Sequence, residues 1–302
     1  MNLPEPDFQR WHTLGRLPPA TLIDARNQLH WAVQTVASIG YTFVEPTPDW
    51  SHTSLTWLDD SASRPGHELG MLASPWAPGL TRFRAALRLT DLTLLLLDEE
   101  GDLHSECNLA ERTLDDGYIW LTSAITSLML TAKPSTLVRP NHELPAHPTG
   151  GGAVFSYDPP EAFAELARWY ANAYRVLQAL SASSPHASPV QCWPHHFDIA
   201  VLFSFDEAEN AEAGRSIGVG LVPGDGSYAE PYWYIAPWPF PDDPTLPPLA
   251  GEGRWHTEGW HGAVLTATRI VEAGEAEAQA ARVTAFIRSG LDAAHTLLEL
   301  SP

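Results

Sequence analysis

Apolar residues follow the three- and four-residue spacing of an amphipathic helix in two segments of this chain. The first stripe consists of Leu22, Ala25, Leu29, Val33 and Val36. Thr21 is placed to cap this helix, and Gly40 to follow its end. The second stripe follows Asp158 as a cap and Pro159 in the first turn, and consists of Phe163, Leu166, Tyr170, Tyr174 and Leu177. The pattern predicts two helices, each opening one half of the protein.

Short apolar or alternating runs follow each of these helices and predict strands. In the first half the runs are 41–45, 52–58, 83–89, 92–97 and 103–107, the last two forming a hairpin. A helix over 114–130, with Thr113 and Asp116 suited to a capping box, closes this half. In the second half the runs are 190–205, 217–222, 231–237 and 262–268. A closing helix over 283–298 follows them.

The order of helix, strands and helix occurs twice, which predicts the α+β class: two sequential, similar lobes, each an antiparallel sheet flanked by helices. We expect an N-terminal lobe at 1–132, a Pro/Gly-rich linker at 133–157 and a C-terminal lobe at 158–302. The repetition indicates an internal duplication. Two unrelated α+β lobes are the alternative, because the halves share few identities.

The chain of 302 residues carries a formal net charge of −20, and Lys133 is its only lysine. Its arginines are scattered along the sequence. We therefore expect no nucleic-acid partner, because such binding needs a concentrated cationic surface. The acidic balance still permits a local basic pocket. Lys133 precedes Pro134 at the start of the expected linker, which is a poor place for a Schiff-base nucleophile.

The first eight residues have neither the basic nor the apolar region of a secretory signal. No stretch approaches the roughly 20 apolar residues that span a bilayer. We therefore expect a cytoplasmic protein that does not bind membranes. Cys107 and Cys192 lie far apart and outside any CxxC motif, which predicts buried, reduced thiols. The sequence leaves the oligomeric state open.

The segment 193–198 is the first candidate for chemistry. If it is a strand, alternation puts Trp193, His195 and Phe197 on one face, and His196 with Asp198 on the other. A carboxylate beside an imidazole suits an acid/base dyad or half of a metal site. The alternative is a His–Asp hydrogen bond that stabilises the end of a strand.

A second cluster spans 255–261 and contains Trp255, His256, Glu258, Trp260 and His261. In an extended segment His256 and Glu258 project to the same side, at a spacing that a divalent metal accepts. Together with ligands from 196 and 198 they would form a metal site with an open position for water. The alternative is amphipathic packing with polar tips at the surface. The sequence leaves the cofactor unknown, with a divalent metal as one candidate.

An aromatic strand supplies the third candidate. Alternation puts Tyr228, Glu230, Tyr232 and Tyr234 on one face and Trp233 on the other. Flat rings with one carboxylate suit a sugar, a nucleobase or a cationic amine. The alternative is that these rings fill the core between sheet and helix.

Several short motifs resemble those of an uncharacterised bacterial family, a domain of unknown function of about this length. They are Leu29-His30-Trp31, Ser156-Tyr157-Asp158-Pro159, Ser188-Pro189-Val190 and Phe197-Asp198-Ile199-Ala200. The resemblance covers most of the chain and implies no activity, cofactor or catalytic residue. His195 and His196 lie outside the motifs that support it.

Three functional hypotheses from different classes follow. The first is binding of a small aromatic, sugar-like or amine-bearing molecule in a pocket of the C-terminal lobe, walled by Trp193, Tyr232, Tyr234, Trp255 and Trp260. The second is a metal-assisted hydrolase that uses His196, Asp198, Glu230 and His256. The third is a structural or partner-binding protein without pocket chemistry.

Overall fold

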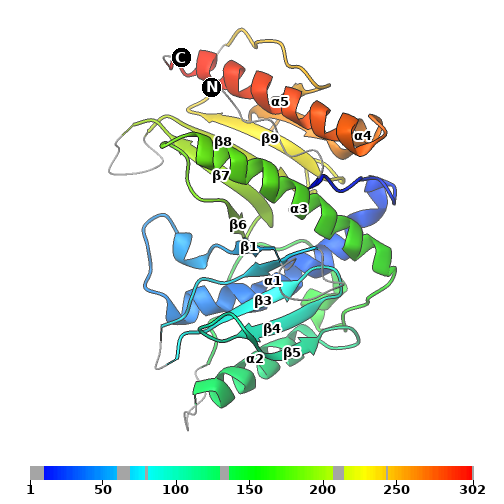
Figure 1. Ribbon diagram of the computed structural model, residues 1–302, viewed down its shortest axis with the longest axis vertical. Coiled ribbons are helices and arrows are strands. Elements are labelled where there is room, and N and C mark those ends of the chain that lie inside the picture. Colours follow the sequence, from blue (N-terminus) through cyan, green and yellow to red (C-terminus); the bar gives the residue numbers. More distant parts are fainter. Residues whose placement is uncertain are drawn as a thin grey trace. The chain divides into compact units, whose positions relative to one another are not determined.

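The computed structural model describes residues 10–59, 69–78, 81–129, 136–206, 214–242 and 244–300 (Figure 1). The chain forms two compact units. Unit 1 comprises Met1–Ala20, Arg168–Val190 and Asp198–Pro302, and unit 2 comprises Thr21–Ala167 and Gln191–Phe197. These units are discontinuous, so they do not coincide with the segments 1–132, 133–157 and 158–302 expected from the sequence. Part of the expected linker, including Lys133, lies outside the described residues.

The N-terminal segment belongs to unit 1 because side-chain amides bind its backbone. Asn172 Oδ1 accepts from His12 N at 2.9 Å, and Asn172 Nδ2 donates to His12 O at 2.8 Å. The buried Gln279 accepts from Leu14 N at 2.9 Å and donates back to Leu14 O at 3.0 Å. These reciprocal pairs hold a segment that has no strand or helix of its own between Trp11 and Pro18.

Unit 2 contains an antiparallel five-stranded sheet of order β1-β2-β3-β4-β5. Its strands are β1 (Thr56–Leu58), β2 (Met71–Ala73), β3 (Arg84–Arg88), β4 (Thr93–Leu97) and β5 (Leu103–Asn108). The helices α1 (Ile23–Phe43) and α2 (Leu114–Met129) pack against it. Gly117 of α2 lies against Leu94 of β4 and Thr35 of α1, so both helices cover the face that carries Leu94. The predicted capping box is confirmed: Thr113 N donates to Asp116 Oδ2 at 2.8 Å, and Asp116 N to Thr113 Oγ1 at 3.1 Å.

The second sheet is also antiparallel and has the order β10-β11-β9-β8-β7-β6. Its strands are β6 (Gln191–Trp193), β7 (Asp198–Ser204), β8 (Ser216–Val222), β9 (Tyr232–Trp238), β10 (Arg254–His256) and β11 (Gly262–Thr266). The helices that follow or precede them are α3 (Pro160–Ser183), α4 (Ala267–Val271) and α5 (Ala276–Leu297). The α+β class with two antiparallel sheets and flanking helices is therefore confirmed.

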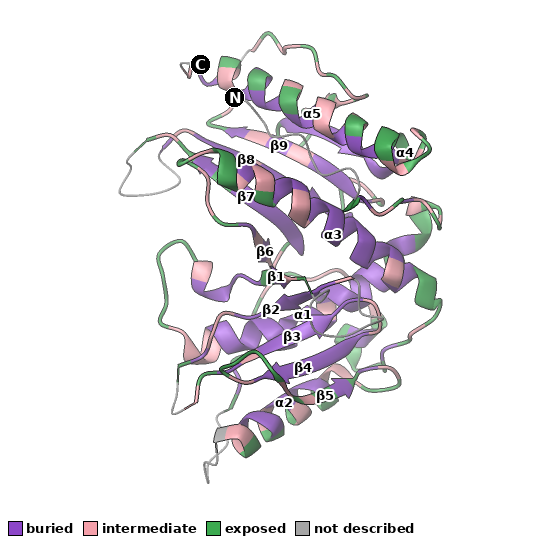
Figure 2. Cartoon of the chain, viewed as in Figure 1, coloured by how far each residue is buried: buried purple, intermediate pink, exposed green. Residues whose placement is uncertain are grey.

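One face of β7–β11 forms the core of unit 1 with α5. In Figure 1, α3 and α5 cross in front of strands β7–β9. Gly290 of α5 lies directly against Ile235 of β9. Register pairing aligns Ile235 with Val219 and Ala263, so these residues share that face. Figure 2 shows the consequence, with buried strands beneath an α5 whose outer side is exposed. Burial of this apolar face is the main stabilising contribution in the unit.

Several sequence predictions at element ends are wrong. Helix α1 continues through Gly40 to Phe43, so 41–45 is not a strand, and its N-cap is Leu22 rather than Thr21. The run 52–58 begins as a short 3₁₀ turn and becomes a strand only at Thr56. The run 190–205 is interrupted between β6 and β7. The three-residue strands β2 and β10 were not predicted, because so few residues show no clear alternation.

Among the described residues, no helix is both long enough and apolar enough to cross a membrane. Cys107 and Cys192 are both buried thiols, as their positions in the sequence predict.

Gly40 provides a test of the close approach between α1 and the 3₁₀ turn at Ser51–Thr53. A Cβ on Gly40 would lie 2.2 Å from the backbone oxygen of His52, which cannot move away as a side chain can. Although Gly→Ala inside a helix normally stabilises by about 1 kcal/mol, we expect Gly40→Ala to lower the free energy of unfolding by about 2 kcal/mol or more. Urea denaturation of the variant and the wild type measures this change in the free energy of unfolding.

Gly290→Ala is the matched control in α5, because its added Cβ would press most closely on the terminal Cδ1 of the Ile235 side chain rather than on backbone. We expect Gly290→Ala to lower the free energy of unfolding by less than Gly40→Ala does. Equal or greater stability of Gly40→Ala relative to the wild type would contradict the described approach.

Candidate functional site

Tyrosines of β9 gather on the face of unit 1 that lies away from α5. Tyr232 and Tyr234 pair with Thr266 and Val264 of β11, whereas Trp233 pairs with Leu265 on the other face. The predicted division into two faces is therefore confirmed for Tyr232, Trp233 and Tyr234, whereas Tyr228 and Glu230 lie before β9 begins. We name the group on this face the tyrosine cluster; it consists of Val222, Tyr228, Tyr232, Tyr234, Trp260 and Val264.

Carboxylates hold the two β9 phenols in place. Tyr234 Oη donates to Asp198 Oδ2 at 2.8 Å, and Tyr232 Oη donates to Asp225 Oδ2 at 2.7 Å. Burial raises the pKa of both phenols above the ordinary value, and the neighbouring carboxylates add to the shift. The phenols therefore stay protonated and act as fixed donors. Asp198 is buried, whereas Asp225 is exposed.

His256 joins the tyrosine cluster through both ring nitrogens. Its Nε2 donates to the carbonyl oxygen of Glu258 at 2.7 Å, so in the neutral ring Nδ1 accepts from the Tyr228 hydroxyl at 2.8 Å. The imidazole centroid lies 4.4 Å from that of Trp260. Trp260 Nε1 in turn donates to Ser227 Oγ at 3.1 Å. These contacts fix the loop after β10 against the cluster.

A cavity of about 420 Å³ adjoins the cluster, and we name it the edge cavity. It is lined by Glu230, Glu252, Arg254, Val264, Thr266, Thr268, Arg269 and Glu272. Val264 belongs to both the tyrosine cluster and the lining of the edge cavity. The guanidinium carbon of Arg254 lies 5.3 Å from the centroid of the Tyr228 ring, which links the wall of the cavity to the cluster.

Two pairs of residues set the charge of the edge cavity. Glu230 Oε2 accepts from Thr268 N and Thr268 Oγ1, both at 2.6 Å. Arg269 Nη1 lies 2.9 Å from Glu272 Oε2. Glu252 is exposed at the rim. Three carboxylates and two guanidiniums thus line the cavity, which leaves an excess of one negative charge.

Three other candidates of unit 1 do not join the tyrosine cluster. Trp255 pairs with Ala263 and therefore lies on the α5 face, where its Nε1 donates to Pro247 O at 2.8 Å. Glu258 and His261 are exposed, and His261 stacks on Phe240 with centroids 4.6 Å apart. The predicted pocket wall with Trp255 beside Tyr232 is wrong, because Trp255 lies on the α5 face of the sheet and Tyr232 lies on the opposite face.

Trp193, His195 and His196 belong to unit 2, and they do not alternate on a strand as predicted. Strand β6 ends at Trp193, whose carbonyl accepts from His196 N at 3.2 Å and from Phe197 N at 2.7 Å. Phe197 has a φ of 56°. The residues after Trp193 form a turn, so the predicted common face of His196 and Asp198 is absent. Pro194, which lacks an amide proton, favours this break.

Imidazoles crowd around this turn. The His195 centroid lies 4.3 Å from that of His196 and 5.6 Å from that of His142. Burial and these two imidazoles lower the pKa of His195 to about 4. His30 of α1 stacks on Phe197 at 5.2 Å, and its Nε2 donates to Pro194 O at 2.9 Å. Burial lowers the pKa of His30 to about 4 as well. Both rings are neutral at neutral pH.

Among the described residues, no group of three or more His, Cys, Asp or Glu side chains is arranged to hold a metal ion. The residues considered as metal ligands have other partners. Asp198 accepts from Tyr234, Glu230 from Thr268, and His256 from Tyr228, while His196 lies in the exposed part of the turn.

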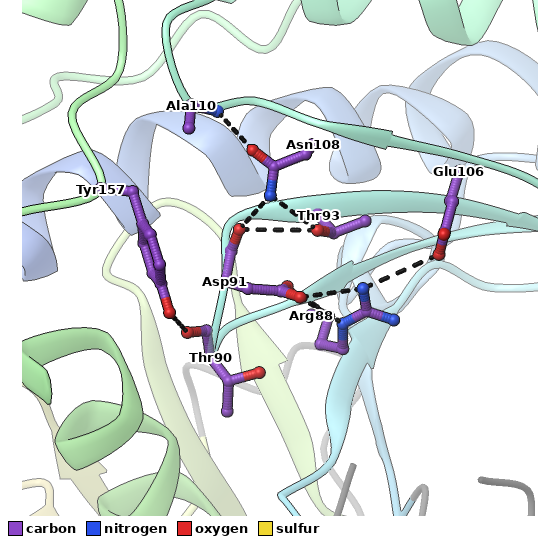
Figure 3. A network of polar contacts seen from close by, with 8 residues as sticks. All are labelled: Arg88, Thr90, Asp91, Thr93, Glu106, Asn108, Ala110 and Tyr157. Atoms are coloured by element: carbon purple, nitrogen blue, oxygen red, sulfur yellow. Dashed lines mark hydrogen bonds and ion pairs between the residues drawn. The ribbon is translucent and has the colours of Figure 1, made fainter. Parts of the chain in front are cut away.

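A second cavity lies in unit 2 and was not predicted from the sequence. Arg84, Ala86 and Arg88 share one face of β3, the face away from α2. The two arginines line a cavity of about 490 Å³ there. Figure 3 shows Arg88 bound to Asp91 and near Glu106. The sequence contains a sign of this cavity in the run 83–89, where the predicted alternation puts both arginines on one face of the strand.

No protein-family model matches this sequence, and comparison with curated proteins and with solved structures gives no match. The similarity of its motifs to an uncharacterised bacterial family stays a prediction.

The two tyrosine–carboxylate bonds of β9 form a natural comparison. We expect Tyr234→Phe to lower the free energy of unfolding by roughly 2 kcal/mol, because it removes a donor from a buried carboxylate. Tyr232→Phe should cost only about 1 kcal/mol, because water can solvate the exposed Asp225. Urea denaturation of both variants measures the difference, and a larger loss for Tyr232→Phe would contradict this interpretation.

The buried histidines predict the pH dependence of stability. Because the pKa of His30 is about 4 in the folded protein and 6.5 ordinarily, the unfolded chain binds this proton first as the pH falls. The contribution of His30 to the free energy of unfolding is therefore greatest above pH 6.5 and declines toward pH 4, by on the order of 3 kcal/mol.

Urea denaturation across this pH range should show a weaker decline for His30→Gln than for the wild type. His104→Gln, which removes an exposed imidazole of β5, is the matched control. The same pH dependence in His30→Gln and the wild type would refute the role of His30.

Proposed function

We propose that the protein binds a small, amine-bearing molecule in the edge cavity of unit 1. The proposal depends on one observation: a cavity of about 420 Å³, with an excess of carboxylates, adjoins a cluster of aromatic rings held in place by hydrogen bonds. Ligand pockets for small molecules typically have volumes of about 300–1,000 Å³ and combine apolar walls with a few polar anchors. The edge cavity lies in this size range, and it is lined by polar anchors and by the apolar Val264.

The charges favour a cation. Glu272 is neutralised by Arg269, and Glu230 already accepts two hydrogen bonds, so Glu252 supplies the carboxylate with the fewest competing contacts. An ammonium group would bind beside Glu252, while the body of the ligand lies over Val264 and the hydroxyls of Thr266 and Thr268 accept or donate hydrogen bonds. A hydroxylated amine, such as an amino sugar, suits this combination best.

The rigidity of the tyrosine cluster supports binding rather than proton transfer. The phenols of Tyr232 and Tyr234 are held protonated by burial, and both nitrogens of His256 are engaged. The two phenols thus act as fixed hydrogen-bond donors that preorganise the wall beside the site. A cytoplasmic location remains part of this proposal.

Calorimetric titration of the full chain with matched probes tests the proposal. Glucosamine, tyramine and putrescine carry amines, and glucose, 4-ethylphenol and 1,4-butanediol are their neutral counterparts. We expect at least one amine to bind about tenfold more tightly than its neutral partner, because the charge-assisted contact contributes about 1.4 kcal/mol or more. Glu252→Gln should remove this preference.

Glu258→Gln is the control, since it makes the same charge change at an exposed residue outside the cavity. It should retain the preference. Equal affinities for amines and neutral partners, or equal losses in Glu252→Gln and Glu258→Gln, would overturn the proposal.

A further inference from the structure

The cavity of unit 2 combines an apolar floor with arginine side chains, and we name it the arginine cavity. It is lined by Leu58, Asp59, Met71, Arg84, Arg88, Leu95, Leu97, Gly101, Asp102 and Leu103. Its floor belongs to a buried cluster formed by Met71, Ala73, Ala86, Leu95 and Leu97. A cavity of about 490 Å³ with this floor is large enough for a small apolar molecule.

The charge of Arg88 is neutralised within the protein (Figure 3). Arg88 Nε donates to both carboxylate oxygens of Asp91 at 3.0 Å, and its Nη2 lies 2.9 Å from Asp91 Oδ2 and 3.7 Å from Glu106 Oε2. Asn108 Nδ2 donates to the backbone oxygen of Asp91 at 2.7 Å, which fixes the turn that carries it. Arg88 is therefore a structural cation.

Arg84 is different. Its guanidinium carbon lies 4.4 Å from the centroid of the Trp76 ring, so its face is stacked on an aromatic surface. Its Nε is buried and has no hydrogen-bond partner, and among the described residues no carboxylate forms an ion pair with it. Arg84 is half-buried, and a partly desolvated guanidinium without an ion-pair partner is stabilised when it binds an anion.

We propose that the arginine cavity binds a small monocarboxylate with an apolar body. The carboxylate pairs with the planar donor fork of Arg84, which matches its two oxygens. The apolar body lies over Met71, Leu95 and Leu97. This site is independent of the edge cavity, which belongs to the other unit.

The charge balance favours a carboxylate over a phosphate ester. One guanidinium in this cavity is unpaired, and it matches one negative charge. Asp59 and Asp102 also line the cavity, but both are exposed, so water screens their repulsion at the rim. A dianion would need a second free cation beside Arg84, whereas Arg88 is already paired.

Calorimetric titration of the full chain with hexanoate, and with hexanamide as the neutral partner of the same shape, tests this site. We expect hexanoate to bind at least about tenfold more tightly than hexanamide, and Arg84→Met to abolish the difference. Hexyl phosphate should bind more weakly than hexanoate. The hexanoate–hexanamide comparison on the wild type decides the proposal even if Arg84→Met fails to fold.

Arg82→Met is the matched control. Arg82 also stacks on Trp76, at 5.3 Å, but it is exposed and does not line the cavity. It should keep the preference for hexanoate. Equal binding of hexanoate and hexanamide, or an equal loss in both arginine variants, would overturn the proposal. Tighter binding of hexyl phosphate would replace the carboxylate with a phosphate ligand.

Discussion

The alternation of side chains along antiparallel strands, with helices packed on one face of the sheet, is the constraint on which this structure depends. In unit 2 the alternation buries Leu94 and Leu96 beneath α1 and α2, and turns Leu95 and Leu97 to the other face. In unit 1 it buries Ile235 against α5 and turns Tyr234 away. The helix-covered face of each sheet is apolar, and the other face carries polar groups beside a smaller buried apolar cluster.

The two candidate sites use this freedom differently. The edge cavity adjoins phenols that buried or nearby carboxylates hold in fixed positions, and carries an excess of negative charge. The arginine cavity has one cation neutralised by Asp91 and a second, Arg84, without a carboxylate partner. The unpaired Arg84 suits the arginine cavity to an anionic ligand, whereas the excess carboxylate suits the edge cavity to a cationic one.

The sequence predicted the α+β class, most of the longer strands and the two faces of β9, because these follow from periodicity. It predicted the ends of elements less well, because a single residue there can override the hydrophobic periodicity. Pro194 and the positive φ of Phe197 break the expected strand, which separates His196 from Asp198. Gly40 lies inside α1 rather than after its end, and its missing Cβ allows the backbone of His52 to approach closely. The unpaired state of Arg84 depends on tertiary contacts, which periodicity does not contain.

Paired truncations in β4 test the tighter packing of the helix-covered face most directly. Leu94 and Leu95 are adjacent and chemically identical, but Leu94 lies against α2 and Leu95 lines the arginine cavity. Leu94→Ala should lower the free energy of unfolding by roughly 3 kcal/mol and Leu95→Ala by less, because a side chain at a cavity loses fewer packing contacts. Urea denaturation that finds Leu95→Ala equally or more destabilising would contradict the account.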